Sequence, residues 1–144
     1  MMSYLGIGAM AQLLFLASVA GIFQELVPPT VAQGTTSGIT EPRQLVVRSA
    51  ADWRALWAAH SPQPAPDVDF SRSVVAGVFL GSRPSAGFRV EITNVSIQGN
   101  RAVVQFVEHR PGSDDIVAQM LTAPFHLVAL PNSVRDVSFQ ETKP

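Results

Sequence analysis

The sequence predicts an α+β fold, in which a mainly antiparallel β-sheet of about six strands carries one N-terminal amphipathic helix packed on a face. Two observations support this prediction. From Asp67 to Pro131, short runs of β-branched and aromatic residues are separated by Gly and Pro turn signals. Ahead of them, one stretch repeats apolar residues at helical spacing. An up-and-down or sandwich arrangement without a covering helix is the alternative.

Composition limits the number of domains and the classes of partner. The chain has 144 residues, of which 47% are hydrophobic and 15% charged, against about 25% charged in a typical soluble domain. One folded domain is expected. The formal net charge is −1 and the Lys and Arg residues are scattered, so we expect no nucleic-acid partner. The absence of cysteine excludes disulfides, thiolate metal sites and a cysteine nucleophile.

The N-terminal segment, residues 1–26, is typical of a signal peptide or N-terminal anchor. Leu5–Phe23 is almost continuously apolar, and Ser18-Val19-Ala20 supplies the small residues that a signal peptidase recognises. No Lys or Arg precedes this run, although a signal peptide normally has one, so an uncleaved anchor and a buried helix are the alternatives. We expect an extracytoplasmic protein, periplasmic or secreted, whose mature chain begins between Gly21 and Gln33. The protein meets a membrane only through this segment, if the segment is not cleaved.

A flexible linker and then the folded domain follow. Residues 27–43 are rich in Pro, Thr, Gly and Ser and have no apolar face to bury, which predicts a linker. The domain spans residues 44–144 and begins with a β-prone run at Gln44–Arg48.

A helix comes next. Ser49, with Asp52 three residues later, forms a capping pattern in which the hydroxyl accepts from a free backbone N–H. The prolines within residues 62–66 end the helix. One face carries the large side chains, and we interpret the two tryptophans there as core packing rather than a ligand-stacking site. These residues are Trp53, Leu56, Trp57 and His60.

The remaining elements are predicted strands. Val74–Leu80 is apolar on both faces, which is typical of a central strand covered on both sides. Phe88–Ile92 alternates, and the alternation changes phase after Asn94, which indicates a bulge. The turn at residues 98–101 predicts an antiparallel hairpin with the following strand. The later strands are expected at Ala102–Glu108, Ile116–Leu121 and Phe125–Leu130, with an edge strand at Val134–Gln140 that carries Val137 and Phe139 on one face.

No pattern in the chain indicates catalysis, a metal or a cofactor. Asp67 and Asp69 have the spacing that begins a calcium loop, but the Gly and Glu that complete one are missing, so we interpret both as turn or capping residues. The three histidines lack metal-ligand spacing, and no Gly-x-Ser-x-Gly motif marks a nucleophile. We expect a protein that is not an enzyme, with no catalytic or metal-binding residues and no cofactor. The histidines are His60, His109 and His126.

Two loops are the candidates for partner binding. The loops Arg83–Phe88 and Arg110–Asp115 each combine an arginine, a proline that stiffens the backbone and a glycine. Rigid loops of this kind suit protein recognition, because little entropy is lost when they bind. The alternative is that they are only well-formed connections. The candidate partner surface comprises Arg83, Phe88, Arg110, Phe125 and His126.

A succession of short motifs resembles the C-terminal domain of the PrcB protease-complex subunit. The motifs are Asp69-Phe70-Ser71, Val75–Gly81 with Arg83 and Pro84, Gly87–Ile92, Arg110-Pro111-Gly112 and Pro124–Val128. Each motif is short, but their order and spacing together are specific over Gln44 to Pro131. The chain has Ala86-Gly87-Phe88 where the family usually has Gly-Gly-Tyr, which keeps the aromatic ring but not the hydroxyl.

The resemblance implies an exported bacterial accessory domain that is not an enzyme. The family takes its name from a subunit that helps to stabilise a surface protease complex. We therefore expect a non-catalytic exported protein-interaction domain that binds or stabilises an extracytoplasmic protease. A protease inhibitor acting through the rigid loops, and a small hydrolase with an unrecognised site, are the alternatives.

Overall fold

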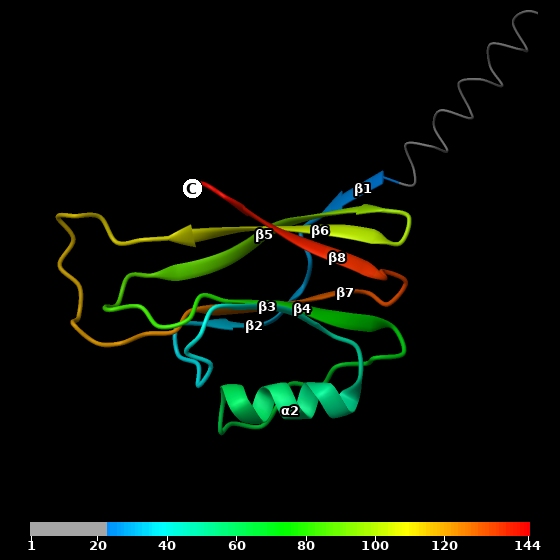
Figure 1. Ribbon diagram of the computed structural model, residues 1–144, viewed down its shortest axis with the longest axis horizontal. Coiled ribbons are helices and arrows are strands. Elements are labelled where there is room, and N and C mark those ends of the chain that lie inside the picture. The colour runs from blue at the N-terminus through cyan, green and yellow to red at the C-terminus, as the bar shows by residue number, and fades with distance from the viewer. Residues whose placement is uncertain (1–22) are drawn as a thin grey trace, which may run out of the picture.

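The computed structural model describes residues 23–144, which form three layers: two four-stranded sheets and one helix (Figure 1). Sheet A has the strand order β1 (Phe23–Leu26), β5 (Arg89–Gln98), β6 (Arg101–His109), β8 (Asp136–Thr142). Sheet B has the order β2 (Thr30–Gly34), β7 (Phe125–Pro131), β4 (Ser73–Phe79), β3 (Arg43–Val47). The helix α2 (Ala50–His60) covers the face of sheet B that points away from sheet A.

The protein is thus mainly β, with a single short helix among the described residues, and α+β describes it only broadly. The prediction of one six-stranded sheet is wrong, since the eight strands divide into two sheets. The helix is also not N-terminal, because three strands precede it. Apart from the β5–β6 hairpin, the paired strands are distant in the sequence. The sequence pattern of a strand reports which of its faces are buried but not which sheet it joins.

Sheet B is buried on both faces, and its central strands β4 and β7 show why. Alternate side chains of β4 point to opposite sides: Val74, Ala76 and Val78 pack against sheet A, and Val75 and Phe79 pack against the helix. In β7, Val128 and Leu130 face sheet A while Phe125 and Leu127 face the helix. The prediction of a central strand covered on both sides is confirmed for β4.

The β5–β6 hairpin follows the sequence pattern. The two strands pair antiparallel from Arg89↔His109 to Gln98↔Arg101, and the register shifts between Ile92 and Asn94. This shift confirms the predicted bulge. The turn has Gly99 at φ +61, a left-handed conformation that glycine adopts without strain.

The helix is held at its start and at both indole rings. The Ser49 side chain accepts a hydrogen bond from the Asp52 backbone N–H at 3.2 Å, which confirms the predicted cap. Trp53 Nε1 donates to the Pro66 carbonyl at 3.0 Å, and Trp57 Nε1 donates to the Gln63 carbonyl at 2.7 Å. The indoles therefore tie the proline-rich segment back onto the helix.

Two predicted strands need revision. Residues 116–121 form no strand; they belong to a long loop between β6 and β7. Their apolar character indicated a strand, but Ile116 is fully exposed and has no sheet to pack on. The last strand does lie at the edge of a sheet, as expected, and it pairs parallel with β6, which departs from the mainly antiparallel pairing of the rest.

The N-terminal predictions fall partly outside the described residues. Residues 1–22 lie outside, so the predicted leader is described only from Phe23, where β1 begins and pairs antiparallel with β5. Residues 30–34, within the predicted linker, form β2 and pair with β7. Polar side chains and Pro28-Pro29 obscured the β pattern there. Within residues 23–144, no helix has the length and hydropathy needed to cross a bilayer.

We expect Trp53→Ala and Trp57→Ala each to lower the free energy of unfolding by about 3 kcal/mol, as deletion of a large buried aromatic does. The two side chains are only 4% and 8% exposed. Chemical denaturation measures the effect, and Arg54→Ala on the exposed face of the same helix is the control, expected within about 0.5 kcal/mol of wild type. Two tryptophan variants as stable as that control would contradict the packing described for the helix.

Candidate functional site

The two loops singled out from the sequence lie side by side and form one projecting arm, which we define as residues 81–88 and 110–124. The arm extends beyond the strands at the end of the sandwich where β6 and β4 finish (Figure 1). Arg83 and Thr122 exchange backbone hydrogen bonds of 2.8 and 3.0 Å, and the Ala86 N–H donates to the Ala118 carbonyl at 3.0 Å. Backbone pairing therefore joins the two segments.

The arm continues the pairing of β4 with β7. The last pair of that ladder is Phe79↔Phe125, and the Leu80 N–H then donates to the Pro124 carbonyl at 2.9 Å. The Arg83–Thr122 bridge follows directly. The arm is consequently an irregular extension of sheet B, and sheet B holds its base in place.

A close backbone contact stiffens the middle of the arm. Gly87 has φ +95, and a Cβ atom at this position would lie 2.9 Å from the Cβ of Pro111. Only glycine fits this backbone conformation and this space without a shift of its neighbour. In the turn that follows Pro111, the Gly112 N–H donates to an Asp115 carboxylate oxygen at 2.7 Å.

An ion pair fixes the base of the arm. Arg83 Nε lies 2.8 Å from Glu108 Oε2, and Arg83 Nη2 lies 3.2 Å from Glu108 Oε1. The Glu108 side chain is only 6% exposed. Hydrogen bonding from Arg83 lowers the pKa of Glu108 below its usual value, and Arg110 contributes further at 3.5 Å. The Arg83 guanidinium carbon also lies 6.0 Å from the centre of the Phe88 ring.

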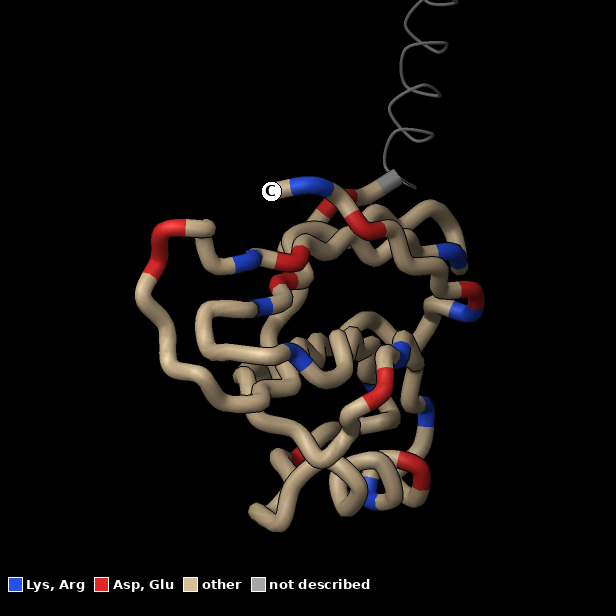
Figure 2. The backbone as a smooth tube through the Cα atoms, turned by 60° about the vertical axis from the view of Figure 1, so that its left-hand side comes forward, with Lys and Arg blue, Asp and Glu red and all other residues tan. Residues whose placement is uncertain are grey.

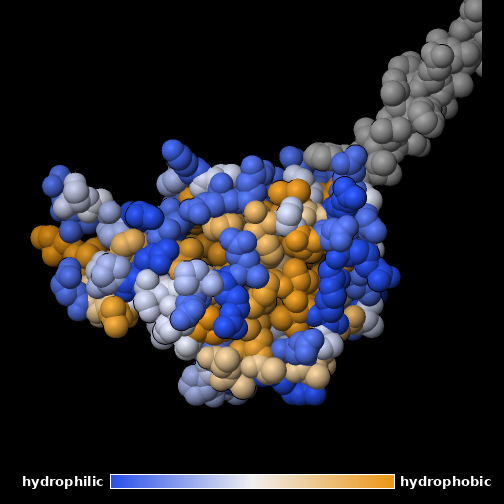
Figure 3. Space-filling view, viewed as in Figure 1, coloured by the Kyte–Doolittle hydropathy of each residue, from blue (hydrophilic) through white to orange (hydrophobic). Residues whose placement is uncertain are grey.

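The outer part of the arm presents apolar side chains to solvent. Ile116 is 101% exposed, Leu121 77% and Met120 55%. Residues 116–125 contain no charged side chain, and the arm is uncharged along this stretch in Figure 2. Apolar surface gathers at the outer end of the arm in Figure 3. These residues were predicted to form a strand from their apolar character, although apolar and polar residues do not alternate there as they do in a half-buried strand.

Among the residues predicted for the partner surface, Arg83, Phe88 and Arg110 lie together at the base of the arm. Phe125 and His126 do not join them, because they are only 7% and 4% exposed. The corner at Pro124 turns the chain into β7, whose side chains pack in both cores. Neither residue offers an exposed side chain to a partner.

His126 instead connects the two sheets. The Ile92 N–H, at the bulge of β5, donates to His126 Nδ1 at 2.8 Å, so the Nε2–H is left to donate to Thr30 Oγ1 at 2.8 Å. Burial lowers the pKa of His126, and Glu91 opposes this shift. The imidazole is therefore neutral near pH 7. His60 is likewise buried, with a lowered pKa, and its Nδ1 lies 2.7 Å from Ser37 Oγ.

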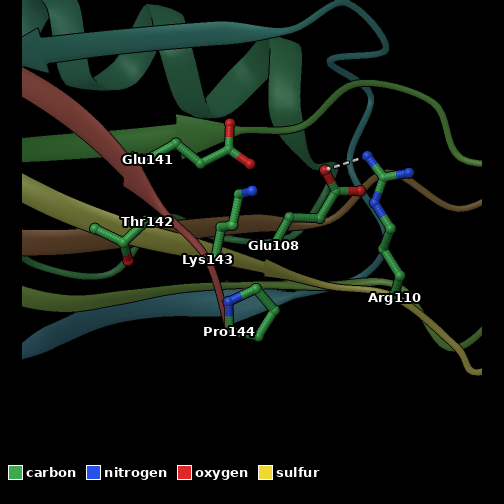
Figure 4. Close-up of a pocket in the computed structure, with 6 residues that line it drawn as sticks. All are labelled: Glu108, Arg110, Glu141, Thr142, Lys143 and Pro144. Atoms are coloured by element: carbon green, nitrogen blue, oxygen red, sulfur yellow. Dashed lines mark hydrogen bonds and ion pairs between the residues drawn. The ribbon is translucent and has the colours of Figure 1, made fainter.

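An open pocket lies beside the base of the arm, between the ends of β6 and β8 (Figure 4). It contains both acidic and basic side chains and no nucleophile paired with a base. Within the part of the chain that the structure describes, no three His, Asp or Glu side chains cluster as metal ligands do. The pocket is lined by Glu108, Arg110, Glu141, Thr142, Lys143 and Pro144.

Comparison with protein families matches residues 74–131 to the PrcB C-terminal family. This segment runs from β4 to β7 and contains the whole arm, so the resemblance predicted from the sequence is confirmed. The PrcB C-terminal match begins later than Gln44, where the sequence placed the start of the resemblance. Neither the curated proteins nor the solved structures include a match to this chain.

We expect Arg83→Ala to lower the free energy of unfolding by about 3 kcal/mol, because it leaves the buried Glu108 carboxylate without its main partner. Arg110→Ala is the matched control: its side chain is 71% exposed, and a change within about 0.5 kcal/mol is expected. Denaturant unfolding measures both. Adding Glu108→Ala to Arg83→Ala should recover part of the loss. Equal losses for the two arginine variants would contradict this account of the ion pair.

Acid should destabilise the fold before its carboxylates titrate. His60 and His126 have folded pKa values below the unfolded value of 6.5, so the unfolded chain binds more protons as the pH falls below 6.5. The melting temperature should therefore decrease between about pH 7.5 and about pH 5.5. Glu91 and Glu108 have lowered pKa values, so the stability that their ionised forms contribute is lost only at a lower pH, below 4.5.

His126→Gln tests the assignment, since glutamine can accept and donate hydrogen bonds but takes up no proton in this range. The pH dependence of its melting temperature between about pH 7.5 and about pH 5.5 should be weaker than that of wild type, with His60 supplying the remainder. A variant with the wild-type slope would show that the His126 imidazole is not held neutral by the fold.

Proposed function

We propose that the protein is a non-catalytic, exported interaction domain that binds or stabilises an extracytoplasmic protease through the projecting arm. One observation carries the proposal: three large apolar side chains stand exposed on an arm whose backbone is fixed by hydrogen bonds at its base and middle. Exposed apolar residues gathered on one feature are typical of a protein-binding surface.

The energetics favour a protein partner for this arm. Full burial of an isoleucine, leucine or methionine side chain stabilises a complex by about 1.5 to 3 kcal/mol each. Because the arm is already ordered by the Arg83–Thr122 pairing and the Gly87–Pro111 contact, little conformational entropy is lost on binding. The arm is free of charge along residues 116–125, so a partner buries it without desolvating an ion.

The choice of a protease rests on the PrcB family resemblance, and the choice of an exported protein rests on the apolar residues 5–23. The shape of the arm also supports a second candidate, a protease inhibitor, because a projecting element can enter a substrate cleft. The two candidates share the arm and a protease partner. They differ in whether the bound protease keeps its activity.

Replacing the exposed residues by serine in the triple variant Ile116→Ser, Met120→Ser and Leu121→Ser should weaken partner binding by about thirtyfold or more, as loss of hot-spot side chains does. The full-length protein is used to capture partners from its native envelope, and mass spectrometry identifies them. Binding of the purified partner is then measured with wild type and variant. A protease among the partners is the expected result, and its activity in the complex separates a stabiliser from an inhibitor.

The matched control is Val27→Ser, which changes a 78% exposed apolar residue outside the arm and should leave binding unchanged. Melting temperatures confirm that both variants fold. Wild-type affinity in the folded triple variant would remove the arm from the interface. Capture of partners that include no protease would overturn the assignment to a protease complex.

A further inference from the structure

Strand β8 is an exposed sheet edge without the proline or the bulge that commonly blocks strand addition, and its two charged residues, Asp136 and Glu141, lie at or next to its ends. It pairs with β6 over all seven residues, from Asp136 to Thr142, with no register shift. It contains no proline, lysine or arginine, and within residues 23–144 its outer edge pairs with no strand. An unpaired row of backbone N–H and C=O groups is a template for another strand.

The other three edges are less suited to pairing. Strand β1 has only four residues, and β2 has an irregular register between Thr30 and Ala32. Strand β3 has five residues, and Arg48 beyond its end donates hydrogen bonds of 2.7 and 2.6 Å to the Val134 and Arg135 carbonyls. That side chain links the end of β3 to the turn before β8 and closes one end of the gap between β3 and β8.

Apolar surface borders the β8 edge. Figure 3 shows it between the two sheets, on the side where β3 and β8 are the edge strands. Val137 and Phe139 are only partly buried and pack against the core between the sheets. Toward the arm, a small pocket reaches apolar residues from both sheets, Val78, Leu80 and Phe106. A strand added to β8 would cover this stripe with every second side chain.

The open end of the gap is basic. Two adjoining pockets share Glu108 and Glu141 there. Their combined lining carries four cationic side chains and only these two acidic ones. Glu108 is already paired with Arg83. Lys143 is exposed, and Arg110 makes only the 3.5 Å contact with Glu108. The cations are Arg43, Arg83, Arg110 and Lys143.

We propose that β8 binds an extended segment of a partner protein as an added strand, with apolar side chains at alternate positions facing Val137 and Phe139 and an acidic residue beside Arg110 and Lys143. This proposal rests on the proposed function, since it supplies a second contact for the same partner. Backbone pairing provides affinity, and the alternate side chains and the acidic end provide selectivity. The acidic end fixes the direction of the added strand.

The test uses a fluorescently labelled synthetic peptide of alternating valine and threonine that ends in two glutamates, titrated with the full-length protein. Two isomers are N-methylated on opposite sets of alternate residues, so each loses hydrogen bonding along one edge only. Strand addition predicts that one isomer binds at least about tenfold more weakly while the other keeps the affinity of the parent, because only one edge of the peptide pairs with β8. Hydrogen exchange should slow within residues 137–142 on binding of the parent peptide.

Charge variants test the basic end. Lys143→Glu should weaken binding of the parent peptide by about fivefold, as loss of a surface ion contact does, while Arg54→Glu on the helix should not change it. Equal effects of the two N-methylated isomers, no binding of the parent, or exchange protection confined to other residues would overturn the proposal. Self-association of the protein that the parent peptide abolishes would overturn it too, since a second copy would then be the occupant of β8.

A competition experiment distinguishes a failure of strand addition at β8 from a failure of the proposed function. Excess parent peptide should displace a partner captured from the envelope, and the N-methylated isomer that binds weakly should not. A partner that depends on the arm but resists the peptide would preserve the proposed function and refute strand addition at β8. Peptide binding at β8 without any captured protease would support strand addition and refute the proposed protease partner.

Discussion

Burial of both faces of the β4–β7 pair is the constraint on which the rest of the structure depends. Val75 and Leu127 are inaccessible on the helix side, and Val128 is inaccessible on the side of sheet A. A sheet that is apolar on both faces needs two covers. Sheet A supplies one, and the eleven-residue helix, held through Trp53 and Trp57, supplies the other. The pair also sets the arm in place, because the arm begins where the ladder ends, at Phe79↔Phe125.

Polar contacts between the layers are few and each is satisfied. His126 receives the Ile92 N–H at the β5 bulge, and Gln33 Nε2 donates to the Val90 carbonyl at 2.9 Å, so sheet B is hydrogen-bonded to sheet A at two points. No buried side-chain nitrogen or oxygen atom of the described residues lacks a partner. A bulge leaves a backbone group unpaired in its own ladder, and here the imidazole accepts from it. The stability of the sandwich is thereby linked to the neutral state of one buried side chain.

Local patterns in the sequence predicted the local structure well. Four predicted features depend only on neighbouring residues, and each was confirmed. They are the apolar run of β4 that is buried on both faces, the Ser49 cap, the bulge near Asn94 and the Gly99 turn. The division into two sheets could not be predicted in this way, because it depends on which strands pair. Strand β2 was obscured by a polar composition that the ladder with β7 overrides. For the site, the sequence indicated both loops but not that they pack together as one arm. The Arg83–Glu108 ion pair at the base of the arm joins residues 25 positions apart, which no local pattern reveals.

The same connectivity explains why the arm and the exposed edge lie at one end of the protein. The chain crosses from sheet B to sheet A after β4 and returns after β6, and these two crossings form the two segments of the arm. Strand β8 runs parallel to β6, so its carboxyl end meets the carboxyl end of β6 there, and the pocket of Glu108, Arg110 and Lys143 lies between them. At the opposite end of β8, Arg48 joins the end of β3 to the turn that precedes β8. A partner that reaches the apolar arm therefore approaches the open end of the β8 edge and not its closed end, and a single protein chain can contact both.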